Sequence, residues 1–128
     1  MNNKNNVKEN MIPKLTLFIN AKLRSLGIKA GHEGYKLLVK AILIKTLEDD
    51  ENNFEKFEVI YDKLSITVNK TPKQIADNIY YALNHRNESM AKDNFEKIFG
   101  YSYDNKIFTN KEFIEEFVNI VRIKTAIL

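Results

Sequence analysis

The segment from Thr71 to Arg86 carries the clearest local signal in the chain. Thr71 stands directly before Pro72, and Gln74 follows three residues after Thr71. This spacing predicts a capping box, and proline is tolerated at the first helical position because its missing N–H would have no partner there. The sequence therefore predicts a helix that begins at Thr71.

The periodicity of this helix predicts two different sides. One side forms an apolar stripe at positions i, i+4, i+7 and i+8, made by Ile75, Ile79, Ala82 and Leu83. The opposite side is expected to carry polar and aromatic side chains, namely Lys73, Asp77, Tyr80 and Asn84, flanked by Gln74 and Tyr81.

A second helical pattern comes just before the cap. Apolar side chains recur there at helical spacing, namely Phe57, Ile60, Tyr61, Leu64 and Val68. The polar pair Asn69-Lys70 then separates this segment from the next helix. A helix, a short turn and a capped helix over residues 57–86 are typical of a helix-turn-helix, although an ordinary helical hairpin has the same outline.

The rest of the chain predicts four more helices. They span about Pro13 to Leu26, His32 to Leu47, Glu88 to Phe99, and a last segment that opens with a capping box at Thr109 and Glu112 and runs to about Lys124. Gly27 and Gly100 are expected to end the first and third of these. The predicted fold class is all-α, a compact six-helix bundle containing a helix-turn-helix.

Two of these helices have a predicted role in the core. Residues 32–47 carry a broad apolar stripe, so this helix is expected to be the central pillar of the bundle. In residues 88–99, the side chains expected to point inward are Met90, Phe95, Ile98 and Phe99.

Length and composition predict one domain. A chain of 128 residues with 44% hydrophobic content can bury a core. Residues 1–11 are too polar to join it and are predicted to form a disordered tail, which leaves residues 12–128 as a single helical domain. The acidic run from Glu48 to Asn53 is predicted to be a solvated connector rather than a cation site.

Several classes of function lack their sequence signals. The chain has no cysteine, and its two histidines, His32 and His85, lack metal-ligand spacing, so no metal or cofactor is expected and both are predicted to be structural or surface residues. No phosphate loop, no nucleophile elbow and no motif that pairs a nucleophile with a base is present, so no enzyme and no small-molecule substrate are expected. Without an apolar run of membrane-spanning length or a signal peptide, a soluble, cytoplasmic protein is expected.

The charge is distributed unevenly. Residues 1–46 hold nine Lys and Arg against two acidic residues, whereas residues 47–128 hold eleven against fifteen. A basic segment can attract phosphate, but a solvated lysine-rich helix surface explains the same pattern.

Several short stretches carry a resemblance to a known family: Gly27-Ile28 with Ala30, Gly34-Tyr35, Ala41-Ile42, Tyr61, Asn69 with Thr71, Ile79 and Ala82, Phe99-Gly100-Tyr101, and Thr109-Asn110 with Glu112-Phe113-Ile114. Through them, residues from about 20 to 122 resemble the C-terminal effector domain of the sporulation response regulators. The resemblance implies a six-helix domain that inserts the helix of residues 71–86 into the major groove of a promoter.

The resemblance also shows two departures from the family. The family regulator carries a phosphoacceptor receiver domain before this region, and here only a short polar tail precedes it, so direct control by aspartyl phosphorylation is not expected from this chain. The family's recognition helix carries arginines at the positions of Gln74, Asp77 and Tyr80. Glutamine can pair with adenine, a carboxylate can accept from cytosine, and tyrosine can contact phosphate or a thymine methyl, so a different target sequence is expected.

Two hypotheses of function follow. In the first, the chain is a transcriptional regulator that binds duplex DNA through residues 71–86. The groove would be contacted by Lys73, Gln74, Asn78, Tyr80, Tyr81 and Asn84, with Thr71 and Asp77 beside them, and the phosphates by Lys70, Arg86 and Lys92.

In the second hypothesis, the chain is a protein-interaction module that kept the bundle and lost DNA binding. The acidic balance of residues 47–128 and the pair Tyr80-Tyr81 motivate it, because exposed aromatic side chains are favoured at protein interfaces. The partner would be a second copy of the chain or another protein. A simpler alternative for one of the two tyrosines is packing on a neighbouring helix.

Overall fold

The structure is a computed structural model that describes residues 10–48, 55–104 and 107–125. The predicted tail of residues 1–11 therefore lies outside the described residues except for its last two positions. Of the predicted acidic connector, only Glu48 is described. The description of the fold below concerns the three described ranges.

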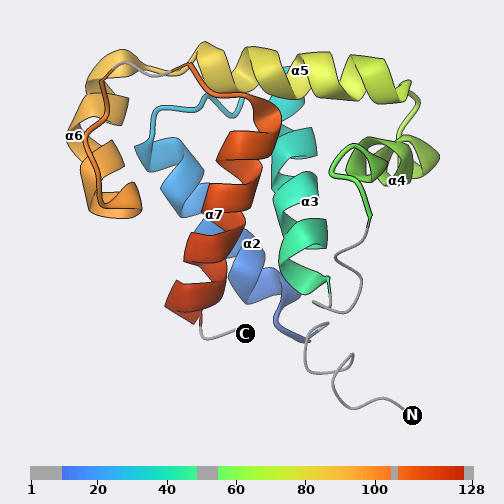
Figure 1. The fold of residues 1–128 in the computed structure, drawn as a ribbon, viewed down its shortest axis with the longest axis horizontal. Helices are drawn as coiled ribbons and strands as arrows, with labels where there is room; N and C mark the ends of the chain where they lie inside the picture. Colours follow the sequence, from blue (N-terminus) through green and yellow to red (C-terminus); the bar gives the residue numbers. More distant parts are fainter. Residues whose placement is uncertain (1–9, 49–54, 105–106, 126–128) are drawn as a thin grey trace.

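Six helices form the described part of the chain, which contains no strand, so the prediction of an all-α fold is confirmed (Figure 1). Their bounds are α2 Ile12–Ser25, α3 Glu33–Leu47, α4 Val59–Thr67, α5 Pro72–Asn84, α6 Glu88–Phe99 and α7 Asn110–Thr125. None of the helices in these ranges combines the length and the apolar character needed to cross a bilayer.

Helix α3 is the centre of the bundle, as its broad apolar stripe predicts. It packs against α2, α4, α5 and α7, and α5 lies across the top of the upright pair α3 and α7 (Figure 1). The stripe predicted for this helix consists of Tyr35, Leu38, Val39, Ile42, Leu43 and Thr46. It was too narrow, because Leu37 and Ala41 are buried as well. A helix covered by neighbours on several sides buries residues beyond a single stripe.

The first helix ends as the position of Gly27 predicts. Leu26 caps α2, and Gly27 follows in the left-handed region with φ of 81°, which glycine adopts without steric cost. The carbonyl oxygen of Gly27 then accepts a hydrogen bond of 2.8 Å from the N–H of Asn87. This bond ties the end of α2 to the start of α6.

One prediction about α6 is wrong. Met90 is exposed, whereas Ala91 and Phe95 are buried. The Asn87 side chain accepts a hydrogen bond from the N–H of Met90 and so caps the helix. Met90 therefore falls in the first turn on the outer side, and the inward positions begin one residue later.

Helix α7 begins with the predicted capping box. The Thr109 hydroxyl accepts from the N–H of Glu112 at 3.1 Å, and the Glu112 carboxylate accepts from the N–H of Thr109 at 3.4 Å. The buried Asn110 amide donates to the hydroxyl of Tyr61 on α4 and to the carbonyl of Ala76 on α5. One side chain thus links α7 to both helices of the helix-turn-helix.

Gly34 is the point at which α5 comes closest to α3. A Cβ built at Gly34 would lie 1.9 Å from the carbonyl oxygen of Asn78 and 2.9 Å from the nitrogen of Ile79. Both atoms belong to the backbone of α5, so a flexible side chain cannot relieve the contact. Only glycine fits this crossing.

We therefore expect the substitution Gly34→Ala to lower the free energy of unfolding by roughly 2–3 kcal/mol, the upper part of the usual cost of overpacking. Chemical denaturation measures it. Gly31→Ala is the matched control, because a Cβ there meets nothing within 4 Å. Equal stability of the two variants would contradict the close crossing.

Candidate nucleic-acid interface

Helix α5 begins with the predicted capping box. The Thr71 hydroxyl accepts a hydrogen bond of 3.1 Å from the N–H of Gln74, and the Gln74 side-chain oxygen accepts one of 2.9 Å from the N–H of Thr71. Pro72 occupies the first helical position. The cap fixes where α5 starts, and it occupies the amide oxygen of Gln74. While the cap is formed, the N–H₂ group of Gln74 takes no part in it and can donate to a partner outside the chain.

The turn before α5 has the length that a helix-turn-helix requires. Residues 68–71 separate Thr67 at the end of α4 from Pro72, and α4 packs directly on α5. A turn of three to four residues between packed helices is typical of this motif. The arrangement that the sequence predicts over residues 57–86 is therefore present.

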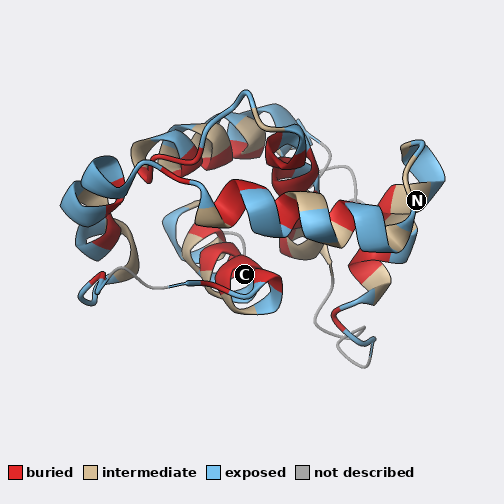
Figure 2. Ribbon diagram, turned by 90° about the horizontal axis from the view of Figure 1, so that it is seen from above, coloured by how far each residue is buried: buried red, intermediate tan, exposed pale blue. Residues whose placement is uncertain are grey.

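The apolar stripe of α5 faces the bundle. Ile75, Ile79, Ala82 and Leu83 are buried as predicted. Figure 2 looks down on α5 and shows exposed residues alternating with buried ones along it. The outward residues are Lys73, Gln74, Asp77, Tyr80 and Tyr81, and this set is called the α5 face below. The α5 face is open to solvent.

The charged residues of the α5 face neutralise each other. Lys73 Nζ lies 2.7 Å from Asp77 Oδ2, one helical turn further on. The hydrogen bond to Asp77 and its negative charge raise the pKa of Lys73. Lys70, in the turn, lies 2.6 Å from the Glu33 carboxylate at the start of α3. Both lysines beside the cap thus have an acidic partner within the chain.

The two adjacent tyrosines lie in different surroundings. The Tyr81 ring stacks on His85 with centroids 3.7 Å apart and meets His32 edge-on at 5.2 Å. Tyr80 makes no ring contact in the described ranges, although 47% of it is exposed, about the same as the 50% of Tyr81. Tyr81 is therefore held in place by two rings, whereas no ring of the described residues contacts Tyr80.

The two histidines converge, which the sequence did not indicate. The rings of His32 and His85 lie 6.4 Å apart beside Tyr81. His85 Nδ1 lies 2.8 Å from the Tyr81 carbonyl oxygen, and His32 Nε2 is buried with no hydrogen-bond partner. Because His32 precedes α3 and His85 follows α5, only the crossing of these helices brings them together.

The Asn84 side chain makes hydrogen bonds within the fold. Its amide donates a 3.1 Å hydrogen bond to the carbonyl of Phe108 and accepts one of 3.1 Å from the N–H of Phe108. The segment before α7 is thereby held against the end of α5. Asn84 was expected to face a DNA groove, and in the structure both ends of its amide are used within the chain.

The structure also corrects the expectation for Arg86. Only 8% of this residue is exposed, and its guanidinium donates to the Tyr103 hydroxyl at 2.8 Å and to the Leu83 carbonyl at 2.7 Å. It lies 5.2 Å from the ring centroids of both Tyr103 and Phe108. An arginine turned into the fold in this way does not reach phosphate. Sequence alone does not show this, because both aromatic partners lie far along the chain.

The remaining predicted residues differ in exposure. Asn78 is half-buried near the crossing with α3, and Lys92 is exposed on α6. Lys70 is half-buried beside Glu33.

Comparison with known families confirms the resemblance described above. Residues 19–121 match the family model described as "Sporulation initiation factor Spo0A C terminal". The match covers most of the chain and includes α3 to α6 completely. No curated protein and no solved structure matches the chain.

The double contact between Asn84 and Phe108 predicts a structural role for this asparagine. We expect Asn84→Ala to lower the free energy of unfolding by about 1–3 kcal/mol, because both hydrogen bonds to the Phe108 backbone are removed. Urea denaturation measures the change. Asn78→Ala, the same substitution on the same helix, removes no hydrogen bond of the described chain and should cost less than ~0.5 kcal/mol. If both variants lose the same stability, the assignment fails.

Proposed function

The chain belongs to the family of Spo0A C-terminal domains, and on this premise we propose that it is a transcriptional regulator that binds duplex DNA through α5. The family is one of DNA-binding transcription factor domains and not one of enzymes. The observation that supports the proposal most is the open α5 face on the outer side of a helix-turn-helix.

The dimensions of α5 suit the major groove. The helix has 13 residues, which corresponds to a length of about 20 Å. In a helix-turn-helix, the N-terminal residues of the second helix contact base edges and the first helix crosses the backbone. The start of α5 is also where its dipole favours a phosphate.

The side chains of the α5 face can read bases without arginine. The N–H₂ group of Gln74 can donate to a base acceptor while its oxygen stays in the cap. The Tyr80 ring can contact a thymine methyl or donate from its hydroxyl to phosphate, whereas the Asp77 carboxylate repels phosphate unless it accepts from a cytosine amino group. Lys70 and Lys73 are the proposed phosphate contacts. Thr71 fixes the helix start, Tyr81 forms the edge of the contact, and Asn78 contributes at its half-buried margin.

The pairing of Lys73 with Asp77 predicts modest affinity. A lysine that is neutralised by a carboxylate releases fewer counterions from DNA than an unpaired lysine or an arginine would. The same holds for Lys70 beside Glu33. Base contacts are therefore expected to supply a large share of the affinity, and low salt is expected to be needed to detect binding.

The first test is binding to DNA as a function of salt. A random-sequence duplex pool is enriched on the immobilised chain, and fluorescence anisotropy then measures the affinity of the tightest duplex from ~50 to ~200 mM salt. We expect affinity to fall as salt rises, and Lys73→Ala to reduce the slope by less than one, because Lys73 is paired with Asp77. Lys124→Ala, at the far end of α7, is the control and should leave the slope unchanged. The absence of binding to every duplex at low salt would end the proposal.

The second test removes the carboxylate from the α5 face. Asp77→Asn leaves Lys73 without its acidic partner and removes a charge that phosphate repels, so we expect a severalfold gain in affinity, or ~1 kcal/mol. The same anisotropy titration measures it. Asp93→Asn on α6, also exposed, is the matched control and should change affinity less than twofold. A loss of affinity in Asp77→Asn would instead indicate that this carboxylate accepts from a base.

A second candidate function has one specific observation in its favour. The only charged residues of α5 cancel each other, while two adjacent tyrosines are half-exposed beside them. Such a surface also fits a protein partner, because tyrosine contributes contact area at low entropic cost. Two results together would favour this candidate. No duplex would bind at low salt, and sedimentation would show self-association of the chain. The double substitution Tyr80→Ala with Tyr81→Ala would abolish this self-association.

A further inference from the structure

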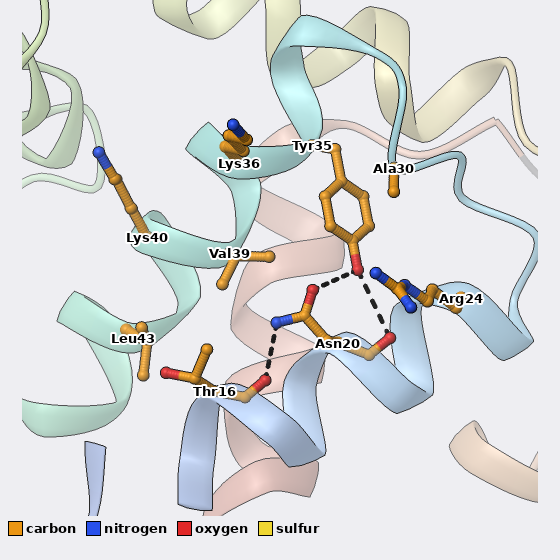
Figure 3. Close-up of a pocket in the computed structure, with 9 residues that line it drawn as sticks. All are labelled: Thr16, Asn20, Arg24, Ala30, Tyr35, Lys36, Val39, Lys40 and Leu43. Carbon is orange, nitrogen blue, oxygen red and sulfur yellow. Dashed lines mark hydrogen bonds between the residues drawn. The ribbon is translucent and has the colours of Figure 1, made fainter. Parts of the chain in front are cut away.

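A groove of about 410 Å³ runs between α2 and α3, on a part of the surface that the proposed DNA contact does not use (Figure 3). This volume lies within the range of small-molecule sites. One wall is formed by residues 16, 20 and 24 of α2, and the other by residues 35, 36, 39, 40 and 43 of α3. The α2–α3 groove is therefore a candidate site for a small ligand.

The floor of the α2–α3 groove is apolar and needs no hydrogen bond from a ligand. It is formed by the Tyr35 ring, Val39 and Leu43 (Figure 3). The Tyr35 hydroxyl donates to the side-chain oxygen of Asn20 at 2.6 Å, and the Asn20 N–H₂ donates to the Thr16 carbonyl. Because the Tyr35 hydroxyl already donates to Asn20, an apolar body can cover the Tyr35 ring without leaving this hydroxyl unsatisfied.

The rim of the groove is basic. Arg24 and Lys36 are exposed, and neither pairs with an acidic side chain in the described part of the chain. In Figure 3, Arg24 lies on one side of the Tyr35 ring and Lys36 on the other, whereas the Lys40 side chain extends away from the ring. None of the residues that line the groove is acidic. An anion is the complementary ligand.

We propose that the α2–α3 groove binds a small organic anion with an apolar body. Its carboxylate, sulfonate or phosphate head lies between Arg24 and Lys36, and its body covers Tyr35, Val39 and Leu43. The apolar floor distinguishes this site from a DNA phosphate contact, which requires cations but no apolar surface. The proposal stands independently of the DNA-binding function of α5.

The experiment compares two fluorescent probes that differ in charge. Anilinonaphthalene sulfonate has an aromatic body and an anionic head, and phenylnaphthylamine has the same type of body without the anion. Each is titrated into the folded full chain, with fluorescence and calorimetry as readouts. We expect the sulfonate to bind one per chain, and the double substitution Arg24→Gln with Lys36→Gln to weaken it roughly tenfold or more, as loss of charge-assisted hydrogen bonds does.

Two controls identify the site. The double substitution Lys97→Gln with Lys124→Gln removes the same charge from exposed positions of α6 and α7 and should leave the affinity for the sulfonate unchanged. Phenylnaphthylamine should bind wild type and the Arg24/Lys36 variant equally, because its body contacts only the floor. In ¹H–¹⁵N spectra, the largest sulfonate-induced shifts are expected at Val39 and Leu43.

The proposal is overturned by any of three results. In the first, the Arg24/Lys36 and Lys97/Lys124 variants bind the sulfonate with equal affinity. In the second, several sulfonates bind per chain without shifts at Val39 and Leu43. In the third, the sulfonate does not bind to the wild-type chain. Far-UV circular dichroism verifies that each variant is folded. Because all four substituted side chains are exposed, folding is expected to be retained.

Discussion

The contact of α5 with α3 at Gly34 determines how the rest of the molecule is arranged. With no Cβ on that residue, the backbone of α5 at Asn78 reaches the surface of α3 directly. This approach places Ile75 and Ile79 in the core, and the helical period then turns the other side of α5 outward. The orientation of the α5 face thus follows from a backbone contact rather than from the side chains that form it.

Features encoded within a few residues were predictable from the sequence. The capping boxes at Thr71 and Thr109, the apolar stripe of α5 and the all-α class all depend on residues three to eight positions apart. The contacts of Asn84 and Arg86 within the fold were not predictable. Their partners Phe108 and Tyr103 lie on the segment after α6, which returns to the end of α5 only in the folded chain. The meeting of the two histidines depends on the helix crossing in the same way.

The chain combines the packing of a helix-turn-helix with a recognition-helix surface that has little positive charge. The packing that orients α5 is present, whereas the side chains at Gln74, Asp77 and Tyr80 carry no net positive charge. In addition, each lysine near the cap has an acidic partner. In the proposed DNA complex, electrostatic attraction to phosphate is therefore expected to be weaker than an arginine-bearing helix would provide, and shape and base contacts are expected to contribute relatively more.

The stack of Tyr81 on His85, with His32 against its edge, means that the exposed surface is assembled from more than one segment. His32 belongs to the loop before α3, Lys70 is anchored by Glu33, and Asn84 is fixed by Phe108. Transplanting α5 alone into an unrelated helix-turn-helix would leave these supports behind. The α5 face is therefore not portable with the helix alone and would have to be re-engineered together with the loop before α3 and the segment before α7.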